Sequence, residues 1–183
     1  MNIFVLSYSA IPQVHYKENA RMHCDKHVVK MITESVQMLV TVLPRYFSSY
    51  VAIDLEPPCR PLAAGHAKHP CVLWLWQDIT HFNYLAQLAQ SLCEEKQARW
   101  PLNADHEYQI FIWQLCQRLQ TIHDLTDQTK LPETFATAVK SETLRSTNTP
   151  HVEAVTIYRD YYIRDKASFA TWRGVGKPDW WPL

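Results

Sequence analysis

Residues 23–41 read HCDKHVVKMITESVQMLVT, and this stretch decides the fold that we expect. If a helix is drawn through it at 100° per residue, one side is apolar and carries Val28, Ile32, Val36 and Leu39. The other side holds polar groups within an arc of roughly 80°, and these are His23, His27, Lys30, Glu34, Gln37 and Thr41. We therefore predict an amphipathic helix from about Tyr16 to Leu43, ended by Pro44, with a packed back and a polar front.

The rest of the chain repeats this helical pattern. Apolar spacing and proline positions predict further helices at about 70–99, 104–123 and 151–172. Residues 2–6 are predicted as a short buried strand or extended segment, and residues 125–149 as a polar connection of loop and short helix. We expect a mainly α fold: residues 1–183 form a single domain, a helical bundle with a short N-terminal extended segment.

Composition narrows the function classes. The 183 residues carry 18 basic and 18 acidic side chains, so no chain-wide positive field attracts polyanions. With only 3 glycines, the chain has no glycine-rich loop that could cradle a dinucleotide or nucleoside triphosphate. The 5 cysteines are an odd number without a Cys-x-x-Cys pair, which is typical of reduced thiols. No cationic leader or long apolar run is present, so we expect a cytoplasmic protein without membrane contact.

The polar front carries the groups with chemical potential. Lys30 is flanked by Lys26 and His27. Such neighbours, together with an element that covers the amine, would lower its pKa and free its lone pair to attack a carbonyl-like carbon. Glu34, one turn away, is then a candidate acid or base. The alternative interpretation is an ordinary ion pair between Lys30 and Glu34 on a solvated face.

Histidines offer a second chemistry. His23 and His27 are four residues apart, and with His66 or His69 as a third ligand they would make a metal-dependent hydrolase. His66 and His69 also precede a predicted helix that starts at Pro70, where anions bind readily. The alternative for His69 is that it only caps this helix.

The C-terminal stretch has a composition that suits nucleic acid. Residues 158–177 hold five basic and two acidic side chains, a net charge of +3, among five aromatic residues. Arg159 and Lys166 are candidate phosphate clamps, and Tyr162 is a candidate contact to a base. The alternative is that the aromatic rings pack in the core and the arginines pair with aspartates.

Three motifs resemble a known family. Lys26, Lys30, Glu34 and Gln37 form a K-x-x-x-K-x-x-x-E-x-x-Q pattern that is similar to bacterial pyrimidine dimer DNA glycosylases of the endonuclease V type. The helix opened by His69-Pro70 and containing Cys93-Glu94-Glu95 and Arg99, and the ending Pro178-Asp179-Trp180-Trp181-Pro182, resemble later segments of that family. The start of the chain and residues 158–162 look closer to uncharacterised phage-encoded proteins.

The resemblance implies a helical enzyme that attacks an N-glycosidic bond of DNA with an amine, forms a Schiff base and nicks the strand by β-elimination. The family prototype uses the α-amine exposed when the initiator Met is removed. Here Asn2 is too large for the usual removal, so the terminal amine would be that of Met1, and the role is expected to fall to Lys30 or Lys26.

The expectation is therefore a DNA glycosylase or abasic-site lyase without a metal or cofactor, acting on DNA or a nucleotide. Catalysis is assigned to Lys30, Glu34, Lys26 and His27, and substrate binding to His23, Gln37, His66, His69, Arg159, Tyr162 and Lys166. The first long helix, the loop at 66–69 and the last helix should converge on one polar cleft that shelters Lys30. A non-enzymatic alternative is a phage-type accessory protein with an exposed Trp180–Trp181 patch. The oligomeric state is left open.

Overall fold

A computed structural model describes residues 1–47, 55–121 and 130–182. Within these ranges the fold is mainly helical, as predicted. The helices are α1 (Pro12–Met22), α2 (Asp25–Tyr46), α3 (Ala64–Ala67), α4 (Pro70–Gln77), α5 (Ile79–Arg99), α6 (Gln109–Gln120) and α7 (His151–Asp165). Short 3-10 helices cover Pro101–Asn103 and Glu142–Leu144. The strands β1 (Thr134–Thr137) and β2 (Ser146–Pro150) form an antiparallel hairpin with Phe135 opposite Thr149.

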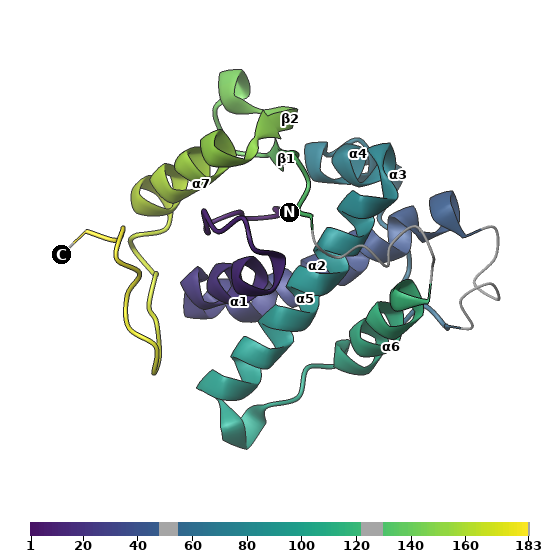
Figure 1. The fold of residues 1–183 in the computed structure, drawn as a ribbon, viewed down its shortest axis with the longest axis horizontal. Coiled ribbons are helices and arrows are strands. Elements are labelled where there is room, and N and C mark those ends of the chain that lie inside the picture. Colours follow the sequence, from purple (N-terminus) through teal and green to yellow (C-terminus); the bar gives the residue numbers. More distant parts are fainter. Residues whose placement is uncertain (48–54, 122–129, 183) are drawn as a thin grey trace.

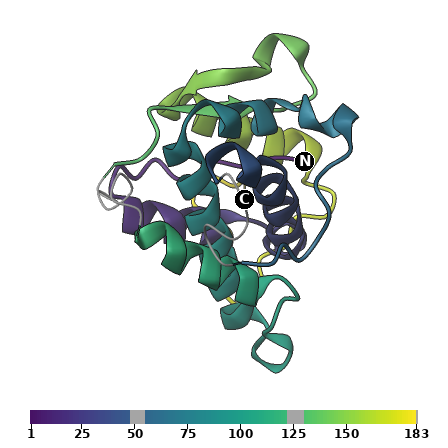
Figure 2. The same cartoon turned by 90° about the vertical axis from the view of Figure 1, so that its right-hand side faces the viewer.

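Helix α5 crosses the middle of the molecule, and α1, α2, α4 and α6 pack around it (Figure 1). The hairpin joins α7 and α4 on one side of this bundle, as the turned view shows (Figure 2). One cluster contains buried hydrophobic side chains from each of these helices and from β1. The predicted apolar back of α2 is confirmed, because Val28, Ile32, Val36 and Leu39 are each 0% exposed.

The first residues run as a buried extended segment beside α1, also as predicted. Ile3, Phe4, Val5 and Leu6 are at most 2% exposed. Two of their backbone groups are bound by Asn19 of α1, whose Oδ1 accepts from the Leu6 N–H at 2.7 Å and whose Nδ2 donates to the Phe4 carbonyl at 3.0 Å. The Asn19 side chain thus makes hydrogen bonds that a neighbouring strand would make in a sheet, and it fixes the position of residues 4–6.

The prediction of one long helix from Tyr16 to Leu43 is wrong in one respect, because the helix is interrupted at His23 and Cys24. Both residues have extended backbone, with ψ of 136° and 159°. Helix α2 starts afresh at Asp25, whose N–H donates to the Thr171 carbonyl at 2.8 Å. A contact with the far end of the chain therefore takes the place of a helical hydrogen bond.

The C-terminal tail is fastened at this break by residues 171–173, which we call the tail strap. The Asp25 carboxylate accepts from the Thr171 hydroxyl at 2.8 Å and from the Arg173 N–H at 3.0 Å. The Trp172 indole donates to the Met22 carbonyl at 3.0 Å. The tail strap therefore connects residues 171–173 to the junction between α1 and α2.

Other predicted boundaries shift for local reasons. The helix predicted over 70–99 divides at Asp78, whose side chain caps α5 by accepting from the Thr80 N–H at 2.7 Å. Pro44 lies inside the last turn of α2 and does not end it. α7 ends at Asp165, before the predicted 172.

The polar connection and the third helix also differ from expectation. The predicted loop over 125–149 contains the hairpin and a 3-10 helix, and its residues 125–129 lie outside the described ranges. The helix predicted over 104–123 begins only at Gln109, and residues 122–123 are not described.

Candidate functional site

Glu34, in the second half of the polar front of α2, lies next to an amine, but the sheltered amine is that of Met1. The Met1 nitrogen is 3.8 Å from Glu34 Oε2, and the two side chains are 7% and 12% exposed. The neighbouring Asn2 N–H donates to the same oxygen at 3.2 Å. Lys30 Nζ is 3.3 Å from Glu34 Oε1, yet its side chain is 65% exposed. The expectation that Lys30 is sheltered is therefore wrong, since it lies on the solvent side of the carboxylate.

The position of Met1 follows from the packing of the residues after it. Asn2 Oδ1 accepts from the Tyr158 hydroxyl of α7 at 3.1 Å. The single proton of this hydroxyl is shared with the Ala136 carbonyl of β1 at 2.9 Å, so α7 and the hairpin together hold the start of the chain. With Ile3 buried directly behind it, the Met1 amine is held at the edge of the core. The apolar residues 2–6 predict a buried segment, but the amine role was expected at Lys30 or Lys26, because the position of the Met1 amine depends on contacts with α7 and β1.

His69, in the loop before α4, lies near the same amine. His69 caps α4, its Nδ1 accepting from the Cys71 N–H at 3.3 Å, as the capping alternative predicted. Burial lowers the pKa of His69 to about 4, helped by the charges of the Met1 amine, Arg145 and His66. His69 therefore lies close enough to Met1 to feel the charge of its amine, while His66 itself is exposed. Arg145, between the 3-10 helix and β2, was missed because no motif surrounds it.

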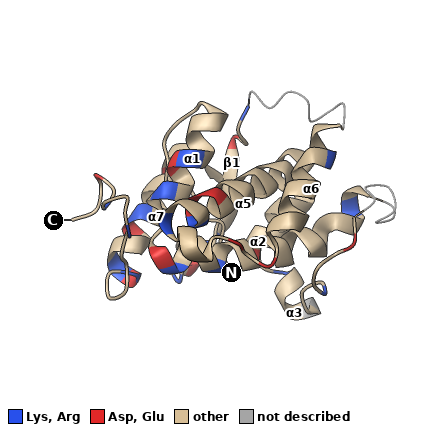
Figure 3. Cartoon of the chain, turned by 90° about the horizontal axis from the view of Figure 1, so that it is seen from below, with Lys and Arg blue, Asp and Glu red and all other residues tan. Residues whose placement is uncertain are grey.

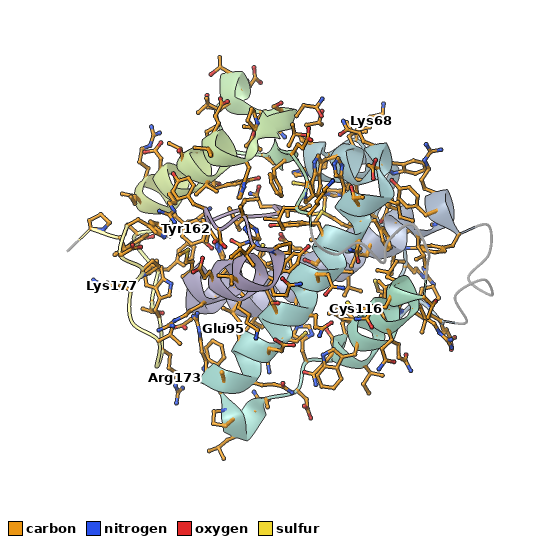
Figure 4. The ribbon with its side chains drawn as sticks, viewed as in Figure 1. Lys68, Glu95, Cys116, Tyr162, Arg173 and Lys177 are labelled. Carbon is orange, nitrogen blue, oxygen red and sulfur yellow. The ribbon has the colours of Figure 1, made fainter. Side chains whose placement is uncertain are left out.

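His27 belongs to a separate and largely buried aromatic cluster. Its Nδ1 is 2.5 Å from the Tyr162 hydroxyl, and its ring stacks on Phe4 with the ring centroids 4.8 Å apart. Figure 4 shows Tyr162 on the side of α7 that faces α1. Burial, with the charges of His23, Lys166 and Lys30, lowers the pKa of His27 to about 3. His27 is therefore neutral at neutral pH and is not a cationic phosphate contact.

His23 does not join the polar front, because the break before α2 turns it into the interior. It is 0% exposed, and its Nδ1 donates to the Asn19 carbonyl at 2.7 Å. Burial lowers its pKa to about 4. Its Nε2 has no hydrogen-bond partner among the described residues. A contact from His23 to substrate would require this end of the bundle to open.

The predicted phosphate clamps have different surroundings. The Arg159 Cζ lies over the rings of Tyr8 and Trp180, 4.4 and 5.2 Å from their centroids. Arg159 Nε donates to the Leu6 carbonyl at 2.9 Å. It thus fastens the N-terminal segment to the tail. Lys166 Nζ lies 4.5 Å from the ring centre of Tyr161, where it donates to the hydroxyl at 3.1 Å. Gln37 is half-buried on α2.

Lys and Arg gather at the end of the molecule that holds α7 and the tail, with Asp and Glu between them (Figure 3). Lys26 belongs to this end, and its Nζ lies 4.8 Å from the ring centre of Phe169. Basic and acidic side chains therefore alternate at this end, and some of them are paired, as Arg164 is with Asp160.

The metal-dependent hydrolase and the accessory protein with an exposed tail patch each require a feature that the described residues do not form. No three His, Cys, Asp or Glu side chains gather to hold a metal ion in the described parts of the chain, which include His23, His27, His66 and His69. Trp180 and Trp181 are half-buried and pack against Tyr162 and Trp172, so they do not form the exposed patch of a docking tail.

Two further results concern the chain as a whole. No helix among the described residues is both long and apolar enough to cross a bilayer. The sequence and fold match no protein-family profile, no curated protein and no solved structure.

Proposed function

We propose that this protein is a DNA glycosylase or abasic-site lyase in which the amine of Met1 is the nucleophile and Glu34 its acid–base partner. The observation that carries the proposal is the 3.8 Å approach of the Met1 amine to Glu34, with both side chains sheltered. The resemblance of the α2 motif to pyrimidine dimer glycosylases supports the same chemistry.

The choice of Met1 over Lys30 rests on shelter. Lys30 reaches the same carboxylate from solvent, with its side chain 65% exposed, whereas the side chain of Met1 is 7% exposed. An amine fixed beside its proton acceptor is also already oriented for attack.

The proposed reaction uses only these two groups. The amine lone pair attacks C1′ of the sugar, the N-glycosidic bond breaks, and the base leaves with the bonding electrons and takes a proton. Opening of the sugar ring gives a Schiff base, and loss of a C2′ proton expels the 3′ phosphate by β-elimination. Glu34 accepts and returns protons and stabilises the cationic Schiff base. Water then hydrolyses the Schiff base and frees the amine.

Borohydride trapping on an oligonucleotide with one abasic site tests the proposal. The amine condenses with the C1′ aldehyde, water leaves, and hydride converts the Schiff base into a stable secondary amine. We expect one covalent adduct, mapped by peptide mass spectrometry to Met1. Lys30→Ala should keep the adduct, whereas a Gly-Ser extension before Met1 should abolish it.

The same extension at the other end of the chain is the matched control and should leave trapping intact. Intact mass must also show that the purified chain begins at Met1. An adduct on Lys30, or trapping that survives the extension at Met1, would contradict the assignment of the amine. Complete absence of an adduct would reject the function.

A further inference from the structure

Two lysines at the end of the molecule that holds α7 and the tail have N–H donors left without an acceptor among the described residues. Lys26, in the first turn of α2, is exposed, and Lys166, just after α7, is half-buried. Neither ammonium forms an ion pair with a carboxylate within residues 1–47, 55–121 and 130–182. We call Lys26 and Lys166 the lysine pair.

Aromatic rings hold both ammonium groups in place. Lys26 Nζ lies over Phe169 at 4.8 Å and Lys166 Nζ over Tyr161 at 4.5 Å. A series of ring contacts connects the two: the His27 ring meets Phe169 edge-on with the centroids 5.7 Å apart, and the rings of His27 and Tyr161 both stack on Phe4, with centroids 4.8 and 6.3 Å away. A ring face orients an ammonium without accepting a conventional hydrogen bond. Of three N–H donors on each nitrogen, Lys166 gives one to the Tyr161 hydroxyl, so donors remain for an anion.

Lys26, the member of the lysine pair on α2, lies along this helix from the proposed reaction centre. Lys26 and Glu34 are separated by eight residues of continuous helix, which is about 12 Å along the axis. Because Lys26, Lys30 and Glu34 follow one another at four-residue steps, they lie on one side of the helix. A stacked nucleic-acid strand advances about 3.4 Å per nucleotide, so this distance equals roughly three to four nucleotides.

We propose that the lysine pair binds phosphate groups of a DNA strand that continues past the nucleotide being processed, so that the substrate is a polynucleotide and not a free nucleotide. The inference rests on the proposed function, because it places the reacting sugar at Glu34. Lysine ammonium groups are common phosphate ligands, and their charge-assisted hydrogen bonds are stronger than neutral ones.

Oligonucleotides with an abasic site at two or at eight nucleotides from either end test this inference. With subsaturating DNA, the rate of borohydride trapping by the wild-type protein should fall about tenfold when one flank, and only one, is cut to two nucleotides, because its phosphate contacts are lost. The Lys26→Gln/Lys166→Gln variant should react with long DNA at this reduced rate and show no further loss on short DNA.

The matched control is Lys17→Gln/Lys130→Gln, which removes two exposed lysines elsewhere and should keep the dependence on flank length. Circular dichroism should confirm that both variants fold. Binding of fluorescent single-stranded DNA without borohydride should lose about 1.4 from the slope of log affinity against log salt in the lysine-pair variant, from two lost contacts.

The outcomes separate the two proposals. The inference would be overturned if the wild-type protein trapped all four oligonucleotides at equal rates, or if the lysine-pair variant kept the wild-type dependence on flank length. In both cases the adduct itself would still support the proposed function. If the wild-type protein gives no adduct, the function fails. The lysine pair is then judged by binding alone: affinity that falls in its variant but not in the control supports it, and equal affinity overturns it.

Discussion

Asp25 and Glu34 are carboxylates on the same helix, yet their partners differ in kind. Asp25 is saturated by fixed donors: the Arg99 guanidinium at 2.9 Å, the Thr171 hydroxyl and the Arg173 N–H. Glu34 has one backbone donor and two amines at 3.3 and 3.8 Å.

The Arg99 side chain is 0% exposed, whereas the amine of Lys30 reaches Glu34 from solvent. A carboxylate whose donors are all fixed in the fold supports stability. A carboxylate such as Glu34, which pairs with an exposed lysine amine and with a terminal amine, is available for proton transfer. The comparison predicts opposite outcomes for variants at the two sites.

The largest effect is expected from Arg99→Ala. It leaves Asp25 and Glu95 without their shared cation and the Arg21 carbonyl without a donor. Loss of one partner from a buried pair costs about 3–5 kcal/mol, so the free energy of unfolding in urea should fall by that amount. Arg145→Ala, which removes an exposed arginine, should change it by less than about 0.5 kcal/mol. A small effect of Arg99→Ala would mean that Asp25 is not a structural centre.

Glu34→Gln should separate chemistry from stability. Glutamine can still accept from the Asn2 N–H, so the fold should hold, but it cannot take up a proton. We expect the trapping rate on abasic DNA to fall about 100-fold.

Glu94→Gln, on the exposed side of α5, is the control and should trap at the wild-type rate. A Glu34→Gln protein that traps normally would show that Glu34 is as structural as Asp25.

The smallest effect is expected from Asp25→Asn, and it depends on pH. Partial burial opposes ionisation of Asp25, but hydrogen bonds from Arg173, Thr171 and Arg99 outweigh it and hold the pKa below its usual value. Folding therefore favours the carboxylate, and the stabilisation is complete above the unfolded pKa of roughly 3.9 and lost as pH falls through the folded pKa.

At pH 7 the variant should be less stable by about 1–2 kcal/mol in urea unfolding, and the difference should shrink below about pH 4. A difference that does not change between pH 7 and pH 3 would contradict the role of the charge.

The sequence predicts the parts of the fold that depend on local periodicity. The mainly helical fold, the apolar back of α2 and the buried segment near Ile3 follow from spacing alone. The break at His23 and Cys24 does not, because no proline or glycine marks it and its replacement hydrogen bond comes from Thr171. By contrast, the division at Asp78 was visible in principle, since Asp78 and Thr80 are typical of a helix start.

The candidate site was predictable in its residue types but not in its geometry. Glu34 was identified from helical spacing, and its sheltered partner depends on where packing leaves Met1. The exposure of Lys30 depends on which elements cover α2, which a single helical pattern does not specify. His27 and Tyr162 were both singled out, but their contact joins residues 135 positions apart.

The tail strap also has a consequence for synthesis on the ribosome. Helices α1 and α2 emerge early, but the carbonyl that accepts from Asp25 N–H belongs to Thr171, 146 residues later in the chain. Until then the junction between α1 and α2 lacks its cover, so nascent chains should be open to proteases near Cys24. The emergence of residues 171–173 from the ribosome is then the step that closes this junction.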